Sequence, residues 1–190
     1  SRCMRPNRTR LPALVIAFAT LLAACGSGEA TTSAGDTGSA DPAASDTTSE
    51  ASETPGAPAQ FTAERLGGGE LTSASFAGKD TVLWFWAPWC TVCRGEADDV
   101  VAASAALDGK VEVIGVAGRD EVPAMEGFVS DTGTGGLTHV VDADGSIWSS
   151  YEVFAQPAYA FIDDSGSVEV LVGALGEQAL VERMQALAEA

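Results

Sequence analysis

The sequence predicts an α/β fold in which a central mixed sheet is flanked by helices. Over residues 60–190, short apolar runs rich in β-forming residues alternate with segments of helical periodicity. After a short N-terminal hairpin, the expected order is β-α-β-α-β-β-α, a pattern in which helices pack on a sheet. A stretch of about 130 residues is also long enough to bury a core. We therefore expect one globular domain at 60–190.

The domain is expected to open with a β-hairpin. Residues 61–66 and 70–73 flank a turn of glycines, Gly67 to Gly69. The central strand follows as an unbroken apolar run, Val82 to Trp86, which breaks at Ala87-Pro88. Its length and composition are typical of a buried strand.

A helix is predicted after this strand, and it begins near two cysteines with C-x-x-C spacing, Cys90 and Cys93. Gly109 is expected to end it. The residues expected on its core face are Ala97, Val100, Val101, Ser104 and Leu107.

The remaining elements follow from the same periodicities. They are a strand at 111–117, a helix at 121–130, a strand at 137–141, a helical or irregular piece at 147–153, an antiparallel pair of strands at 157–163 and 168–172, and a closing helix at 176–188. In the closing helix, Leu180, Met184 and Leu187 are expected to face inward.

The cysteine pair is suited to thiol–disulfide exchange. Cysteine attacks as a thiolate, and an ordinary thiol with a pKa of about 8.5 is mostly protonated at neutral pH. The first turn of a helix carries unpaired N–H groups and a partial positive charge, which would stabilise a Cys90 thiolate. Cys93 lies one turn further in and is more shielded. We therefore expect Cys90 to attack or be attacked, and Cys93 to resolve the mixed disulfide.

Other uses of the pair are weaker hypotheses. A structural zinc site needs about four ligands, and the chain has one histidine and no second cysteine pair, so no metal is expected. Haem attachment needs C-x-x-C-H, and Arg94 stands at the histidine position. An inert disulfide would gain little from closing so short a loop. The dithiol itself is the only redox group expected, with no other cofactor.

The segment from Phe85 to Cys93, F-W-A-P-W-C-T-V-C, resembles the active-site signature of the thioredoxin superfamily. The continuation to Glu96 resembles the TlpA/ResA/DsbE branch, and the F-W-x-P-W-C start with a later Q-P resembles actinobacterial secreted DsbE/DsbF-type proteins. The resemblance covers residues 60–190. It implies a thioredoxin fold and an extracytoplasmic thiol–disulfide oxidoreductase.

The resemblance also implies roles for further residues. Pro157 matches a cis-proline that faces the cysteine pair, and the backbone of Gln156 would pair with an extended substrate. Trp89 is expected to be partly exposed and to offer an apolar face beside Cys90. Glu96 matches an acid that relays protons to the buried thiol; the alternative is a solvated helix acid.

Other residues receive mainly structural assignments. Trp84 stands where thioredoxin has a buried aspartate, and we expect it to pack. Asp98 replaces the proline of the family's E-x-P pattern, so a helix kink there is in doubt. Arg94 is expected to be a solvated guanidinium rather than a thiolate-stabilising charge, and His139 to be a satisfied structural residue rather than a ligand.

The N-terminal segment predicts export. The basic residues Arg5 to Arg10 precede an apolar run of 14 residues, Leu11 to Ala24, which is short for a membrane span of about 20. The end of this run, L-A-A-C at Cys25, resembles a bacterial lipobox and implies a lipid anchor on Cys25 at the outer face of the cell membrane. An ordinary signal peptide with a chance cysteine is the alternative. We assign 1–24 to the signal peptide and 25–59 to a disordered linker rich in Ala, Thr, Ser and Gly.

Composition limits the partners. The chain has a formal net charge of −17, and residues 25–190 hold six basic and 27 acidic residues, a net charge of −21. Such a chain should repel nucleic acid. We expect a monomer that meets the membrane only through its lipid anchor.

Three functions remain as hypotheses. The first is oxidation of exported protein thiols, with an unidentified electron-transfer partner in the membrane. The second is a thiol reductase of the cytochrome c maturation type. The third is a non-catalytic, lipid-anchored binding module. A peroxidase is weaker still, since peroxiredoxins have a pattern of a Thr and a Pro ahead of a lone catalytic cysteine, and the segment from Thr81 to Pro88 does not supply that pattern.

Overall fold

A computed structural model of the chain describes residues 58–190. The predicted signal peptide, the predicted lipidation site Cys25 and nearly all of the predicted linker lie outside the described residues. Pro58 and Ala59 are described, and Ala59 already packs against the core of the domain. Within the described part, no helix is both long and apolar enough to cross a membrane.

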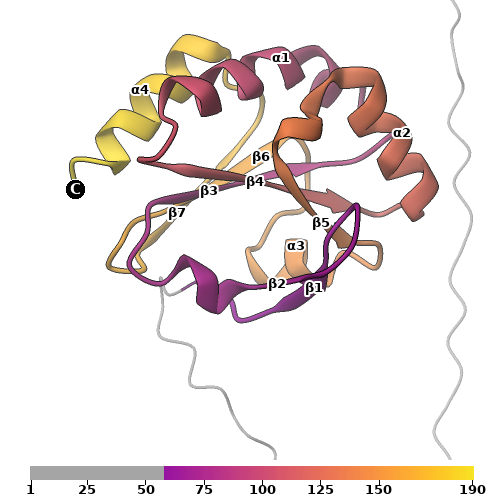
Figure 1. The fold of residues 1–190 in the computed structure, drawn as a ribbon, viewed down its shortest axis with the longest axis horizontal. Helices are drawn as coiled ribbons and strands as arrows, with labels where there is room; N and C mark the ends of the chain where they lie inside the picture. Colours follow the sequence, from indigo (N-terminus) through magenta and orange to yellow (C-terminus); the bar gives the residue numbers. More distant parts are fainter. Residues whose placement is uncertain (1–57) are drawn as a thin grey trace, which may run out of the picture. The chain divides into compact units, whose positions relative to one another are not determined.

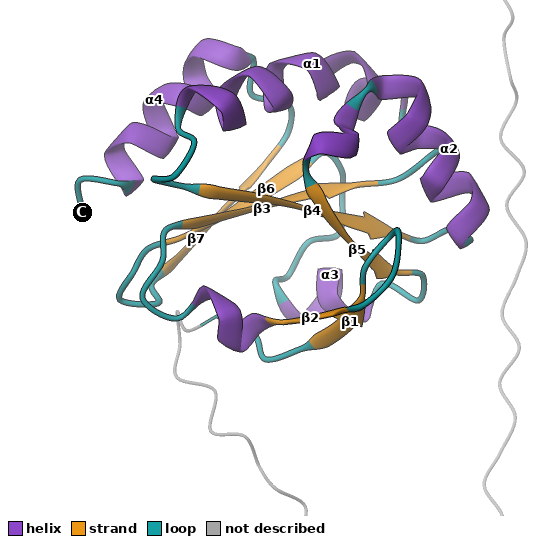
Figure 2. Ribbon diagram, in the orientation of Figure 1, coloured by secondary structure: helices purple, strands orange, loops and turns teal. Residues whose placement is uncertain are grey.

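The described chain forms a five-stranded sheet and a separate two-stranded hairpin (Figures 1 and 2). The large sheet has the order β5-β4-β3-β6-β7, with β3–β4 and β4–β5 parallel and β3–β6 and β6–β7 antiparallel. Its strands are β3 (Thr81–Trp86), β4 (Glu112–Gly118), β5 (Thr138–Asp142), β6 (Ala158–Ile162) and β7 (Val168–Val172). The hairpin consists of β1 (Thr62–Glu64) and β2 (Glu70–Thr72).

Helices cover both faces of the large sheet. Figure 1 shows α1, α2 and α4 on one face, and α3 with the β1–β2 hairpin on the other. The helices are α1 (Thr91–Ala106), α2 (Val122–Thr132), α3 (Ser146–Ser150) and α4 (Glu177–Leu187), with 3₁₀ turns at η1 (Ser73–Phe76) and η2 (Thr134–Gly136). Because both faces are covered, all six residues of β3 are buried, as an apolar central strand requires.

The elements expected from the sequence are present, with shifted ends. The hairpin strands are shorter than predicted, and Gly67, Gly68 and Gly69 between them all have positive φ, which glycine adopts without strain. Helix α1 starts at Thr91, two residues before Cys93.

The buried face of α1 is rotated from the predicted one. Ala97, Val100 and Leu107 are buried as expected, but Val101 and Ser104 are only half-buried. Cys93, Glu96 and Ala103 take their place in the core. The helix turns its small residues and the second cysteine toward the sheet, since these allow close packing beneath a strand that carries two tryptophans.

The strand register determines where a site can form. β3 ends at Trp86 beside Ala117, near the end of β4, and the antiparallel pairing of Phe85 with Ala158 places the start of β6 at the same edge. The C-terminal edge of parallel strands is the usual location of functional sites in open α/β sheets. Cys90, four residues after β3, lies at this edge.

Candidate active site

Cys90 and Cys93 form a disulfide at the start of α1. Cys90 is the N-cap of the helix, and the backbone N–H of Cys93 donates a hydrogen bond to Cys90 Sγ over 3.0 Å. Cys90 keeps 5% of its surface exposed and Cys93 none. Cys93 is thus the more shielded sulfur, as predicted. Cys90 is less open than the sequence suggested, and only its outer edge can meet an incoming thiolate.

A tight turn delivers Cys90 from the central strand to the helix. The N–H of Cys90 donates to the carbonyl oxygen of Ala87 over 3.0 Å, which closes the turn around Pro88 and Trp89. Trp86 is fully buried at the end of β3, whereas the side chain of Trp89 is 55% exposed. Both tryptophans therefore lie as the sequence predicted, one in the core and one at the surface beside Cys90.

Pro157 stands at the same edge of the sheet. The Gln156–Pro157 peptide bond is cis, as the resemblance to the thioredoxin superfamily implies. The carbonyl oxygen of Pro157 accepts a hydrogen bond from the Gly173 N–H over 2.8 Å. This bond continues the pairing of β6 with β7 to the residue just before β6. Pro157 and Gln156 thus lie opposite the end of β3, where the turn to Cys90 begins.

The exposed apolar side chains gather at this edge, a feature that the sequence analysis missed. Among the described residues, the large hydrophobic side chains classed as exposed are Trp89, Val92, Val122, Phe154 and Val172. Trp89 and Val92 follow β3, and Val122 follows β4. Phe154 precedes β6, and Val172 is the last residue of β7, opposite Ala158 at the start of β6. All five thus belong to the sheet edge at which β3 ends. Phe154 is the most exposed, at 72%. We call these five residues the apolar rim.

Beneath the disulfide, Glu96 is buried in a small polar cluster. Its Oε1 accepts a hydrogen bond from Trp84 Nε1 over 2.8 Å, while Oε2 has no partner among the described residues. Burial raises the pKa of Glu96 above its ordinary value of 4.5, and the bond from Trp84 only partly offsets this. Burial, and next the charge of Glu96, also raise the pKa of the adjacent Tyr159 hydroxyl. The cluster therefore favours a protonated carboxyl one helical turn from Cys93.

Trp84 does more than pack. Sequence reasoning placed it in the core, where it is fully buried, but did not connect it to Glu96 twelve residues later. The available signal was that an indole N–H in a buried strand needs an acceptor. The nearest acid on the following helix supplies it. Tyr159, on the neighbouring strand β6, was also missed.

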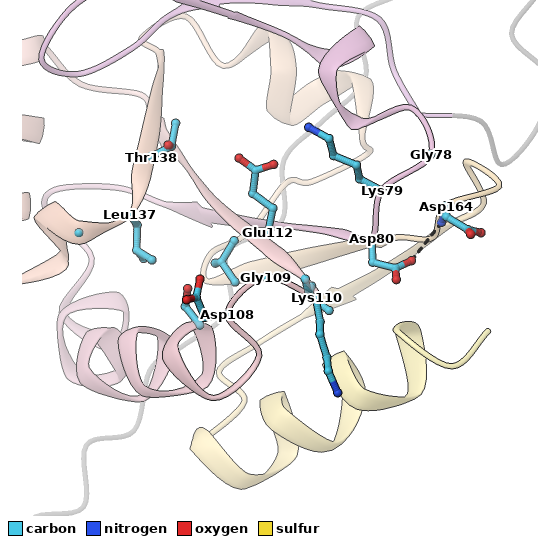
Figure 3. Close-up of a pocket in the computed structure, with 14 residues that line it drawn as sticks. Gly78, Lys79, Asp80, Asp108, Gly109, Lys110, Glu112, Leu137, Thr138 and Asp164 are labelled. Atoms are coloured by element: carbon cyan, nitrogen blue, oxygen red, sulfur yellow. Dashed lines mark hydrogen bonds between the residues drawn. The ribbon is translucent and has the colours of Figure 1, made fainter.

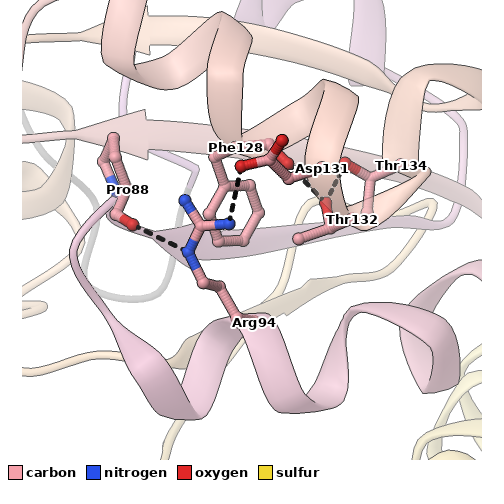
Figure 4. A network of polar contacts seen from close by, with 6 residues as sticks. All are labelled: Pro88, Arg94, Phe128, Asp131, Thr132 and Thr134. Carbon is pink, nitrogen blue, oxygen red and sulfur yellow. Dashed lines mark hydrogen bonds and ion pairs between the residues drawn. The ribbon is translucent and has the colours of Figure 1, made fainter.

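Arg94 is exposed to solvent as expected, but its guanidinium also has partners that the sequence analysis did not predict. Its Nε donates to the carbonyl oxygen of Pro88 over 3.2 Å, its Nη1 bonds Asp131, and its guanidinium lies over the ring of Phe128 (Figure 4). The helix places Arg94 toward α2, and the flat guanidinium stacks on the aromatic ring there. The side chain is 37% exposed, so it is neither free nor fully buried.

His139 has the structural role that the sequence predicted. It is 3% exposed, accepts a hydrogen bond at Nδ1 from Trp86 Nε1 over 3.3 Å, and donates from Nε2 to the carbonyl oxygen of Thr134 over 3.0 Å. Burial lowers its pKa below 6.5, which keeps it neutral. Although 49 residues separate His139 from Cys90 in sequence, it supports Trp86 beneath the site. Within 58–190, no cluster of side chains is arranged to hold a metal ion.

A cavity of about 670 Å³ lies at the opposite edge of the sheet (Figure 3). Its walls come from the starts of β3 and β4, the residues after α1, and Asp164 in the turn before β7. The lining includes neither cysteine. The cavity therefore lies away from the disulfide.

Comparison with known proteins places this geometry in a family. The profile described as "AhpC/TSA family" matches residues 55–171, more than half of the chain. The chain belongs to the AhpC/TSA family. A curated relative, the soluble secreted antigen MPT53 of Mycobacterium tuberculosis, is 40% identical over 131 residues, which cover 67% of this chain and 75% of that protein.

Solved structures agree with this assignment. The structure of M. tuberculosis DsbF in mixed oxidised and reduced forms is 45% identical, with a TM-score of 0.64 over 67% of this chain and 95% of that one. A secreted M. tuberculosis disulfide oxidoreductase homologous to E. coli DsbE is 40% identical, with a TM-score of 0.63 over 67% and 96%. The fold is thus a thioredoxin fold, and this AhpC/TSA family member is a thiol–disulfide oxidoreductase that contains a Cys90–Cys93 C-x-x-C disulfide.

Proposed function

We propose that the chain oxidises the thiols of exported polypeptides, using the Cys90–Cys93 disulfide as the electron acceptor. The observation that carries this proposal is the apolar rim. The exposed large hydrophobic side chains of the described domain belong to the sheet edge that holds the disulfide. Exposed apolar patches on soluble domains mark interaction sites. An unfolded polypeptide offers the apolar side chains and the thiols that such an edge would bind.

The reaction has two balanced steps. A substrate thiolate attacks Cys90 Sγ, the Cys90–Cys93 bond breaks, and Cys93 leaves as a thiolate. A second substrate thiolate then attacks the substrate sulfur of the mixed disulfide and releases Cys90. The substrate loses two electrons to form its disulfide, and the protein dithiol gains them. In the reducing direction, Cys93 would instead attack and resolve the mixed disulfide.

Glu96 is proposed as the proton donor to Cys93. The two residues are three positions apart on α1 and thus neighbours on one helix face, both buried. Because burial raises the pKa of Glu96, its carboxyl retains a proton at a pH where an exposed glutamate has lost it. Passing this proton to the Cys93 thiolate would stabilise the leaving group at the moment the disulfide opens.

Trp89, Gln156 and Pro157 are proposed to hold the substrate. An extended peptide laid along the start of β6 would bond the backbone of Gln156, and its apolar side chains would contact Trp89 on one side and Phe154 on the other. We further propose a lipid anchor on Cys25 and attachment to the outer face of the cell membrane, on the basis of the L-A-A-C sequence. The secreted relatives support export alone. Recycling would then require an electron-transfer partner in the membrane.

The test is oxidative refolding. The oxidised full-length chain is mixed with a reduced, unfolded enzyme that needs disulfides for activity, and the recovered activity is measured against a Cys90→Ser control. Recovery above the control is expected. If no activity is recovered and the chain efficiently reduces a disulfide substrate, the oxidase proposal is wrong and the reductase hypothesis is supported. A reduction potential nearer about −120 mV than about −270 mV is expected for the oxidase.

A further inference from the structure

Arg94 ties together three parts of the molecule around the active-site turn. Its Nε donates to the carbonyl oxygen of Pro88 over 3.2 Å, and its Nη1 lies 3.3 Å from Asp131 Oδ2 on α2 (Figure 4). The guanidinium carbon is 4.9 Å from the centre of the Phe128 ring. Three different kinds of contact therefore fix one cation at the surface.

The first of these contacts reaches into the turn that presents Cys90. Pro88 lies inside the turn closed by the bond from the Cys90 N–H to the Ala87 carbonyl. Arg94 also donates its own backbone N–H to the carbonyl oxygen of Cys90 over 3.1 Å. The side chain of Arg94 thus forms a hydrogen bond with the turn that precedes its own helix. Its charge is held beside the turn whose last residue is the reactive cysteine.

The platform under the guanidinium is rigid. Phe128 is fully buried and stacks on Trp86, with 4.0 Å between ring centroids and 17° between ring planes. Trp86 is held in turn by its hydrogen bond to His139. An arginine that rests on a packed aromatic pair loses its freedom to swing into solvent. The cation therefore keeps a defined position relative to the turn.

We propose that Arg94 is a positioning residue that fixes the Pro88 turn and stabilises the reduced Cys90 thiolate, while Asp131 limits the positive charge available to that thiolate. A nearby cation favours the thiolate of a C-x-x-C pair. Stabilising the reduced form makes the disulfide a stronger oxidant. The inference rests on exchange at Cys90 and not on the direction of the proposed function.

The arrangement predicts shifts of opposite sign at two neighbouring residues. Arg94→Gln removes the cation, so the Cys90–Cys93 disulfide should be less readily reduced, with an equilibrium constant for its reduction roughly three- to tenfold lower. Asp131→Asn removes the opposing charge, and the same constant should rise. The carboxylate of Asp131 is 66% exposed and makes its ion pair at the surface, so this variant should fold as the parent does.

The experiment equilibrates the full-length chain and each variant with glutathione buffers of known ratio. The reduced fraction is read by thiol alkylation and mass measurement, and the Cys90 thiolate is titrated by its ultraviolet absorbance. Opposite shifts in the two variants, and no effect of Asp131→Asn once Arg94 is Gln, are expected. The proposal is overturned if both single variants stay within about twofold of the parent. Because no polypeptide substrate is present, a failed refolding assay would not affect this result.

Discussion

The two edges of the central sheet differ in what they expose. At the edge that follows β3, the apolar rim surrounds a disulfide of which only Cys90 reaches the surface. At the opposite edge, the cavity of Figure 3 is lined by both positively and negatively charged side chains. Its charged residues are Lys79, Asp80, Asp108, Lys110, Glu112 and Asp164.

The two edges of one fold thus differ in that one holds the disulfide and exposed apolar side chains, and the other is lined by charged residues. Charged side chains at the far edge can be stabilised by water or by local bonds such as that from the Asp164 N–H to Asp80 Oδ1, so they need no second molecule. The apolar rim gains free energy only when another molecule covers it. Since the strand register places this rim beside Cys90, binding and exchange are expected at one surface. The following predictions test this contrast, from the largest expected effect to the smallest.

Replacing either cysteine should have the largest effect. Cys90→Ser and Cys93→Ser should both lower the rate of disulfide formation in the refolding assay to that of the uncatalysed reaction, because neither variant can form the internal disulfide. The unfolding midpoint of each variant, measured in parallel, tests whether the fold is kept. Substantial catalysis by a folded Cys93→Ser chain would contradict the two-step exchange.

Glu96→Gln should have the next largest effect on rate. Loss of the proton donor should slow exchange by up to about 10²-fold, a typical contribution of general acid catalysis. The assay is single-turnover oxidation of a small thiol across a range of pH. Asp98→Asn, a neighbouring acid of α1 whose side chain is exposed, serves as the matched control and should leave the rate unchanged. Equal effects of the two variants would argue against a proton-transfer role.

The same substitution should change how stability depends on pH. The raised pKa of Glu96 means that the folded protein holds this proton where the unfolded chain has lost it. Its contribution to stability is therefore complete below about pH 4.5 and is lost as the pH rises through the raised value. Glu96→Gln should gain roughly 1–2 kcal/mol over the parent at pH 8 and little at pH 4, by analogy with buried unpaired polar groups. Denaturant unfolding at both pH values measures this difference.

Truncating the rim should weaken binding without changing the chemistry. Phe154→Ala should raise KM for a reduced polypeptide about fivefold, as the loss of one well-placed aromatic contact does. The equilibrium with glutathione should not move, since Phe154 is not part of the redox pair. Lys110→Ala, exposed at the opposite edge, is the control and should leave KM unchanged. If KM rises equally in both variants, the apolar rim does not bind the polypeptide more strongly than the charged edge does.

His139 should give the smallest effect, seen only in acid. Because burial lowers its pKa, the unfolded chain takes up a proton below about pH 6.5 where the folded protein does not. Its contribution thus makes stability fall as the pH drops below that value. Protonation would also replace the acceptor at Nδ1 with a donor and break the bond from Trp86. Unfolding of a His139→Gln variant should therefore show a weaker loss of stability between pH 7 and 5.

Much of this could be predicted from the sequence because the relevant signals are local. The apolar run ending at Trp86, the C-x-x-C spacing and the Q-P before the last strands each specify a short segment. They led to the strand, the helix N-cap at Cys90 and the cis bond at Pro157 that the structure contains. The structural role of His139 was expected because it is a lone histidine in a strand, far from the cysteines in sequence.

The missed features are long-range. The bond from Trp84 to Glu96 depends on how α1 rotates against β3, and the predicted core face of that helix was off by about one position. The stack of Arg94 on Phe128 joins residues 34 positions apart on two helices. The rim depends on strand register, since Phe154 and Val172 lie far from Cys90 in sequence. Periodicity within one segment carries no information on these pairings.

The most direct test of the central claim is to map the covalent adduct with a polypeptide. Cys93→Ser and Cys90→Ser chains, each activated at the remaining thiol, are mixed with a reduced unfolded polypeptide, and the mixed disulfides are located by peptide mass. The account predicts rapid adduct formation at Cys90 and at most slow formation at Cys93, whose side chain is fully buried beneath the rim. Equal rates at the two sulfurs would contradict it.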